Sequence, residues 1–145
     1  MSRLVCALAF VALEAGLAVG QPSEPSPLVV KTTTDKEVHR VGRLVPIMLT
    51  ETNTSDHGVE VATGCQILRA YATAQDGTVV WVFRDLRLCL TGQGTLPAGT
   101  SRTFGLTWNT KRSAPVVQVS PGVYTITAGV DGVSDSTVVR LRRRR

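Results

Sequence analysis

The chain has 145 residues, which is enough for one domain of ordinary size with short extensions. Its hydrophobic fraction of 43% and charged fraction of 19% are typical of a folded protein and exclude a largely disordered chain. The net charge of +5 equals the charge of five arginines near the C terminus, Arg140 and Arg142 to Arg145. The rest of the chain is therefore electrically balanced, which argues against specific nucleic-acid binding.

Residues 1–20 have the pattern of an export signal. An apolar run from Leu4 to Val19 ends in small residues, so we expect cleavage before Gln21. Glu14 interrupts the run, and the alternative is an uncleaved amphipathic or core helix. The three prolines within residues 21–27 predict an extended linker. We therefore expect a secreted, periplasmic or cell-envelope protein.

Residues 28–141 are expected to form a single β-domain. Short apolar or alternating segments follow one another between turn residues, and none has helical periodicity. The spacing predicts about seven to nine strands in an antiparallel β-sandwich. The candidate segments are 28–33, 38–41, 44–50, 59–63, 66–74, 78–83, 86–90, 102–108, 116–119, 123–128 and 137–141.

The clearest strand follows the turn at Pro121-Gly122. Proline and glycine reverse the chain at low cost, and strict alternation of side chains comes directly after them. Alternation places Tyr124, Ile126 and Ala128 on one face and the residues between them on the other. For Trp81, Trp108 and Tyr124 we expect burial between two sheets, although exposed aromatic side chains can also anchor a partner.

The cysteines support an exported domain. If residues 1–20 are removed, Cys65 and Cys89 remain, and an even pair in an exported protein predicts a disulfide. The alternative is two separate buried thiols. A zinc site is disfavoured because His39 and His57 lack ligand spacing to these cysteines.

Three loops are candidate contact sites for a partner: 53–58, 91–96 and 109–115. Their candidate binding residues are Asn53, His57, Gln93, Asn109, Lys111 and Arg112. Asn53-Thr54-Ser55 also fits a glycan acceptor, and a turn explains the same residues.

We expect neither catalysis nor a cofactor. A nucleophile–base pair of Cys65 and His57 would need a free thiol, which a disulfide removes. Asp76, Asp131 and Asp135 match no known calcium loop and are expected to be solvated turn residues, so no metal is predicted.

Residues 142–145 are expected to be a basic tail. Arg142, Arg143, Arg144 and Arg145 are either a solvated, disordered end or a means of binding an anionic surface.

Several motifs follow one another in a recognisable order. They are Leu49 to Ser55, Thr63-Gly64, Asp76 to Trp81, Leu96 to Thr100 followed by Trp108, and Val119 to Tyr124. Each is weak alone, because Pro-Gly-x-Tyr turns occur in many extracellular sandwich modules, but in this order they resemble the BsuPI-type intracellular proteinase inhibitor domain.

This resemblance implies an immunoglobulin-like sandwich and a protein partner. The first expectation is a non-enzymatic, secreted or envelope-associated binding module that contacts a proteinase or an envelope component. The alternative is a structural or accessory subunit of a cell-envelope assembly, attached through its terminal segments. An enzyme is the remaining alternative.

Overall fold

The computed structural model describes residues 26–85, 90–111 and 119–143. These residues form ten strands and contain no helix, which confirms the all-β prediction. The signal and nearly all of the linker, residues 1–25, lie outside the described residues. The strands are β1 (Leu28–Thr34), β2 (Val38–Arg40), β3 (Leu44–Asn53), β4 (Val59–Thr63), β5 (Arg69–Ala74), β6 (Val79–Val82), β7 (Gly92–Leu96), β8 (Ser101–Asn109), β9 (Gly122–Val130) and β10 (Val133–Arg142).

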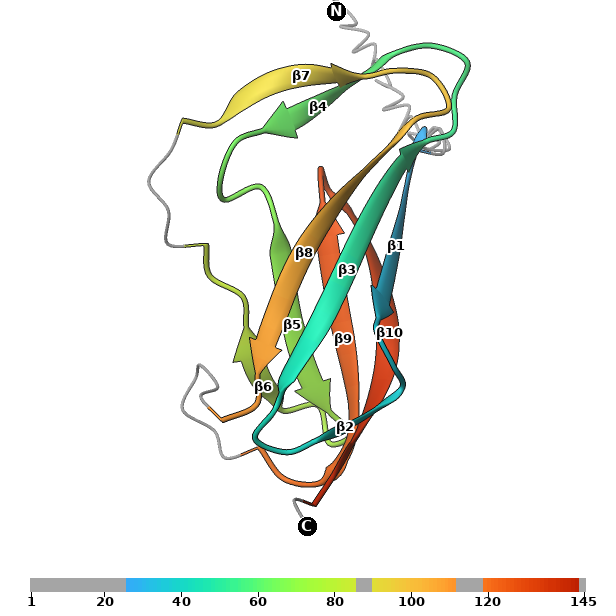
Figure 1. The fold of residues 1–145 in the computed structure, drawn as a ribbon. Coiled ribbons are helices and arrows are strands. Elements are labelled where there is room, and N and C mark those ends of the chain that lie inside the picture. Colours follow the sequence, from blue (N-terminus) through green and yellow to red (C-terminus); the bar gives the residue numbers. More distant parts are fainter. Residues whose placement is uncertain (1–25, 86–89, 112–118, 144–145) are drawn as a thin grey trace, which may run out of the picture.

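Two sheets pack face to face to make the sandwich. One has three strands in the order β1-β3-β8, and the other has five in the order β2-β10-β9-β5-β6. The two-stranded sheet β4-β7 extends beyond one end of the sandwich (Figure 1). All pairs are antiparallel except β2 with β10, which is parallel.

The core is built by alternation along the strands. In β3 the odd-numbered residues from Val45 to Asn53 are buried, whereas Leu44, Pro46 and Met48 are exposed. The predicted inner face of β9 is confirmed, since Tyr124, Ile126 and Ala128 are all buried. Both sheets contribute to one apolar cluster.

Pro46 sits in the middle strand of its sheet, where proline is normally excluded because it lacks an N–H. Asn53 N donates to Thr100 O at 3.0 Å, so the alternating antiparallel ladder makes Pro46 and Thr107 a pair without hydrogen bonds to each other. The nitrogen of Pro46 therefore faces the β1 side. β1 ends at Thr34, which pairs with Ile47, so no ladder bond is lost.

Three aromatic rings join the two sheets. Trp108 of β8 stacks on Trp81 of β6 with ring centroids 6.1 Å apart and meets Tyr124 of β9 edge to face at 5.4 Å. All three residues are buried, as expected. The Tyr124 hydroxyl donates to Ser120 O at 2.7 Å, four residues upstream, which resembles the tyrosine corner of immunoglobulin-like sandwiches.

Two expectations about local structure were wrong. Residues 92–96, expected to be a loop, form β7, because glycine lets this strand lie close to β4: a Cβ on Gly94 would be 2.9 Å from Thr63 Cγ2. β5 begins at Arg69 instead of residue 66, because Gln66 has a φ of 63°, which ends extended pairing. The expected strand residues 86–89 and 116–118 lie outside the described part of the chain.

Trp108 is the largest fully buried side chain among the described residues and contacts two rings of the other sheet, so its truncation should be costly. We expect Trp108→Ala to lower the free energy of unfolding by about 3–5 kcal/mol through lost burial and a cavity. Thr107→Ala, one residue away on the exposed face of β8, should cost less than about 1 kcal/mol. Urea unfolding of both variants checks this. Equal losses would contradict the assigned faces of β8.

Candidate functional site

A buried charge cluster lies behind β8. The Arg102 guanidinium donates through Nε to Glu51 Oε2 at 2.5 Å, through Nη1 to Ala62 O at 2.6 Å and through Nη2 to Asp131 Oδ2 at 2.5 Å. It also lies over the ring of Phe104, 5.1 Å from the centroid. One side chain of β8 thus contacts β3, β4 and the turn between β9 and β10.

The backbone of the turn between β9 and β10 fixes the position of Asp131 in this cluster. Asp131 adopts a φ of 49°, the left-handed conformation that Asp tolerates better than most residues, and Gly132 follows with a φ of 79°. The Asp131 Oδ1 atom accepts the Ala62 N–H at 3.0 Å. Both backbone groups of Ala62 are therefore held by the cluster, which fastens the β4-β7 sheet to the sandwich.

The electrostatics are set by the burial of Glu51, whose exposed fraction is 0%. Burial raises the pKa of Glu51 above its ordinary value of 4.5, and the hydrogen bond and charge of Arg102 act in the opposite direction. Glu51 Oε1 has no hydrogen-bond partner within the described residues. A carboxylate held this way stabilises the fold only through Arg102.

The sequence interpretation missed this cluster. Asp131 was expected to be a solvated turn residue, but only 12% of its side chain is exposed, because Arg102 reaches it. Asp135 is also engaged: its Oδ2 accepts the Thr32 N–H at 2.7 Å and thereby ties β10 to β1. Asp76 is the turn residue expected, with Oδ1 accepting the Thr78 N–H at 2.9 Å. A usable signal was that Glu51 continues the alternation of Ile47 and Leu49 and so points inward.

Asn53 does not present its side chain to a partner. It is the last residue of β3 and is fully buried. Its amide donates to His57 O at 2.7 Å and to Leu96 O at 2.9 Å, and its Oδ1 accepts from Ser55. Asn53 therefore fixes the conformation of the loop that follows it. It does not offer a partner the exposed side chain that was expected.

The other candidate loop residues do not form one site. His57 is exposed and bonds Asp56 at 2.9 Å, and this hydrogen bond lowers the pKa of Asp56. Gln93 is exposed on β7 at the same end of the sandwich (Figure 1). Asn109 and Lys111 lie at the opposite end, where Asn109 Oδ1 accepts the Lys111 N–H at 3.0 Å. Arg112 lies outside the described residues.

The cysteine pairing stays a prediction, because Cys89 lies outside the described residues. Cys65 is buried, and the residues beside the two cysteines are close together: a Cβ placed on Gly64 would be 2.3 Å from Leu90 O. This proximity agrees with a bond between Cys65 and Cys89.

The free edge of β8 is the candidate contact site. Among the described residues β8 pairs with β3 alone, over nine residues. Because the Asn53–Thr100 hydrogen bond fixes the alternation, five residues of β8 turn their N–H and C=O groups away from β3. They are Ser101, Thr103, Gly105, Thr107 and Asn109. The first four are exposed and Asn109 is half-buried, so this edge can pair with an extended segment.

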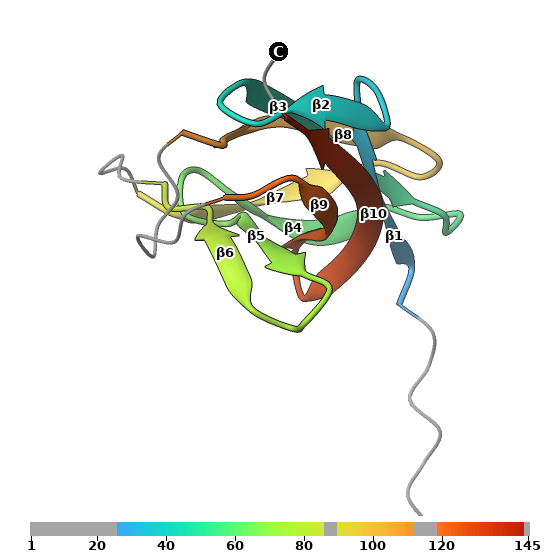
Figure 2. The same ribbon diagram turned by 90° about the horizontal axis from the view of Figure 1, so that it is seen from below.

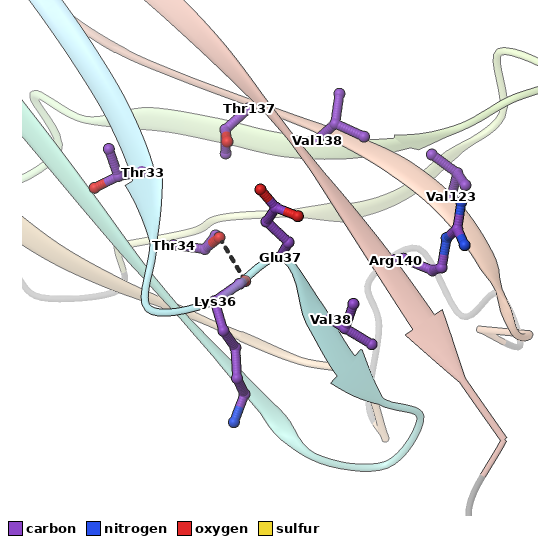
Figure 3. Close-up of a pocket in the computed structure, with 9 residues that line it drawn as sticks. All are labelled: Thr33, Thr34, Lys36, Glu37, Val38, Val123, Thr137, Val138 and Arg140. Carbon is purple, nitrogen blue, oxygen red and sulfur yellow. Dashed lines mark hydrogen bonds between the residues drawn. The ribbon is translucent and has the colours of Figure 1, made fainter.

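A hollow of about 610 Å³ lies along β10, between the end of β1 and the start of β2. Its lining is mixed, and Figure 3 shows the Glu37 carboxylate pointing into it while the Lys36 side chain points away. Some backbone groups beside this hollow are already hydrogen-bonded, since Arg140 N donates to Glu37 O at 2.8 Å. Nothing in this lining selects a ligand.

The described residues contain no cluster of three metal-binding side chains, and none of their segments is a helix able to span a membrane.

Comparison with known proteins supports the fold. No protein-family model matches the sequence, and no curated protein matches it. The chain is similar to the CARDB domain of the PF1109 protein from Pyrococcus furiosus, with 16% identity and a TM-score of 0.50 over 79% of this chain and 87% of that one. The chain is thus an all-β sandwich that is similar in fold to this domain.

Similar folds occur inside larger enzymes. The alkylpurine DNA glycosylase AlkC of Pseudomonas fluorescens matches with 13% identity and a TM-score of 0.52, over 81% of this chain and 31% of the enzyme. The β-glucosidase EmGH1 of Erythrobacter marinus matches with 13% identity and a TM-score of 0.50, over 79% and 15%. The chain thus spans less than a third of either enzyme.

Removing one member of the charge cluster should be strongly destabilising, because the other buried charges are left unpaired. We expect Arg102→Met to lower the free energy of unfolding by about 3–5 kcal/mol, because Glu51 and Asp131 lose their partner while buried. Arg102→Lys should lose less, since it keeps the charge without the planar fork. Arg69→Met, at an exposed position of β5, is the control and should be nearly neutral. A loss below about 1 kcal/mol for Arg102→Met would contradict a supporting role.

Glu51 should also give stability a distinct pH dependence. Since its pKa is raised in the folded state, the folded protein binds this proton more tightly than the unfolded chain. Stability should therefore fall as pH rises from 4.5 through the raised pKa, and Glu51→Gln should lack this fall. Denaturant unfolding of both proteins across this range measures the difference. Parallel pH profiles would rule out a raised pKa.

Proposed function

We propose that this chain is a non-enzymatic, exported binding module that captures an extended segment of a partner protein on the free edge of β8. The observation that carries the proposal is the nine-residue edge, which pairs on one side only within the described chain. Main-chain groups supply the affinity in this mode of recognition, and side chains on alternate positions supply selectivity.

The contacts on the inner face of β8 favour binding of a partner without rearrangement of the strand. Arg102 and Trp108 extend from the inner face of β8 and hold it against β3, the turn at Asp131 and the rings of Trp81 and Tyr124. A strand fixed in this way loses little conformational entropy when a partner pairs with it.

The side chains on the outer face of β8 are small, and most of them carry a hydroxyl group. Thr103 lies 3.3 Å from the Thr50 hydroxyl and Ser101 lies 2.7 Å from the Thr52 hydroxyl, and Gly105 has open space above it. On this face, the described part of the chain therefore presents an incoming strand with no bulky or charged side chain of the kind that natural edge strands usually carry.

The resemblance to BsuPI-type inhibitors makes a proteinase the first partner to consider. Its motifs lie beside this edge, since Leu96 to Thr100 leads into β8 and Trp108 lies within it. The second candidate is a subunit of a cell-envelope assembly, for which pairing of edge strands needs no special side chains. The export pattern of residues 1–20 places either partner outside the cytoplasm.

The test is affinity capture of the tagged protein from its native host, with Thr107→Pro and Thr107→Val compared. Proline removes the outward N–H without breaking a bond to β3, whereas valine keeps the N–H and loses the same hydroxyl. We expect a protein partner to be retained by wild type and Thr107→Val and lost by Thr107→Pro. Circular dichroism should show that both variants are folded.

Two outcomes would contradict this proposal. One is capture of no protein by the wild type, and the other is equal retention by Thr107→Pro. A panel of secreted serine and metalloproteinases, assayed with near-stoichiometric amounts of the chain, separates the two partners. Inhibition relieved by Thr107→Pro would identify a proteinase, and its absence across the panel would leave the envelope partner.

A further inference from the structure

Basic side chains surround the turn between β2 and β3, at the end of the sandwich where the C terminus lies (Figure 1). Three of them, Lys36, Arg40 and Arg43, are exposed and line one hollow of about 510 Å³. The remaining residues of this lining are Val38, His39 and Leu44. The buried His39 ring bonds Lys36 O at 2.9 Å and so holds the β1–β2 connection in place.

A second basic hollow adjoins the first across the same turn. Lys111 and Arg143 line it together with Val41, Gly42 and Pro121, and its volume is about 440 Å³. The turn and Lys111 are in contact range, because a Cβ on Gly42 would be 3.7 Å from the Lys111 side chain. Five cations thus converge on one end of the molecule.

This basic end is built from strands and is not only a tail. Arg142, expected to begin the tail, is the last residue of β10 and pairs with Arg40 of β2. Val41 N donates to Arg142 O at 3.0 Å, which fixes the turn against β10. Seen from below, the C-terminal end of β10 emerges beside β2 (Figure 2). Arg144 and Arg145 lie outside the described residues.

Acidic groups neutralise little of this surface. Asp35 lies 3.8 Å from Lys36 and 3.3 Å from His39. Glu37 points into the neighbouring hollow along β10, which shares Lys36 and Val38 with the first basic hollow (Figure 3). Neither acid lines the two basic hollows, and among the described residues Lys36 is the one cation of the five in an ion pair.

Exposed aliphatic side chains stand among these cations. The exposed fraction is 57% for Leu44 and 37% for Val38, and both line the first hollow. Single-stranded nucleic acids are instead bound by aromatic side chains on which bases stack. The aromatic residues of the strands that reach this end, Trp108 of β8 and Tyr124 of β9, are both buried, and the Tyr124 hydroxyl bonds Ser120. Cations mixed with aliphatic groups fit the interface of an anionic bilayer.

We propose that this end of the sandwich docks on a bilayer that contains anionic phospholipids. Lys36, Arg40 and Arg43 contact phosphate groups, and Leu44 enters the interface between headgroups and acyl chains. This goes beyond the capture of a protein segment and does not depend on the β8 edge, which involves other residues.

The test is co-sedimentation of the full protein, as its host processes it, with phosphatidylcholine vesicles that contain or lack phosphatidylglycerol. We expect binding to the anionic vesicles that decreases at high salt. The triple variant Lys36→Ser/Arg40→Ser/Arg43→Ser should bind at least about tenfold more weakly, since each basic residue near such a surface contributes a factor of about five.

The matched control is Lys31→Ser/Arg69→Ser/Arg84→Ser, which removes three exposed cations elsewhere and gives the same net charge. It should retain most of the binding. Leu44→Ser tests the apolar contact and should weaken binding at every salt concentration, while Met48→Ser, exposed on the same strand, should not.

The proposal fails if the protein ignores the anionic vesicles, if both triple variants lose binding equally, or if Leu44→Ser has no effect. Equal losses would assign the attraction to net charge and the terminal arginines. A labelled single-stranded DNA bound more tightly than the vesicles would assign the surface to nucleic acid. Thermal unfolding of each variant confirms that lost binding is not lost folding, and Lys111→Ser/Arg143→Ser repeats the test at the second hollow.

Discussion

The position of β8 depends on one guanidinium group. Arg102 is the only described side chain that donates to three partners in different parts of the fold, and each donation constrains a different element: Glu51 on β3, Ala62 on β4 and Asp131 between β9 and β10. Burying these charges costs several kcal/mol per ion unless every partner is in place. The cluster therefore contributes specificity more than net stability, because any shift of one element leaves a buried charge unpaired. Ala62 shows this most directly, since both its N–H and its C=O are held.

The consequence for function is that β8 is held from its inner face along most of its length. Arg102 fixes its beginning, and Trp108 fixes its end through the rings of Trp81 and Tyr124. Neither anchor hydrogen-bonds the N–H and C=O groups on the open side of β8. Within the described residues, these groups can therefore pair with another strand. A rigid strand with one free edge is suited to main-chain recognition, whereas the candidate loops are spread over both ends of the sandwich and cannot form a common surface.

Period-two alternation made most of the fold predictable from the sequence. It identified the inner face of β9, and the expected burial of Trp108 and Tyr124 is confirmed. It failed at β7, because glycine-rich segments are typical of loops. Here the glycines instead allow β7 to lie close to Thr63 of β4. The charge cluster was missed because Glu51, Arg102 and Asp131 are far apart in the sequence, and only the register of β3 with β8 brings the first two together. Similarly, Arg142 was assigned to a tail because its parallel partner, Arg40, lies about a hundred residues away, beyond the reach of local patterns.

The two proposed surfaces are compatible in their geometry. β8 runs towards the basic end and finishes at Asn109, two residues before Lys111, which lines a basic hollow. A chain docked on a bilayer through Lys36, Arg40 and Arg43 would therefore have β8 extending away from the membrane from its C-terminal end (Figure 1). The opposite arrangement, with the basic residues beside the edge, would place the bilayer where the partner strand must enter. Separation of the charged end from the pairing edge thus allows one small sandwich to contact a membrane and a protein at the same time.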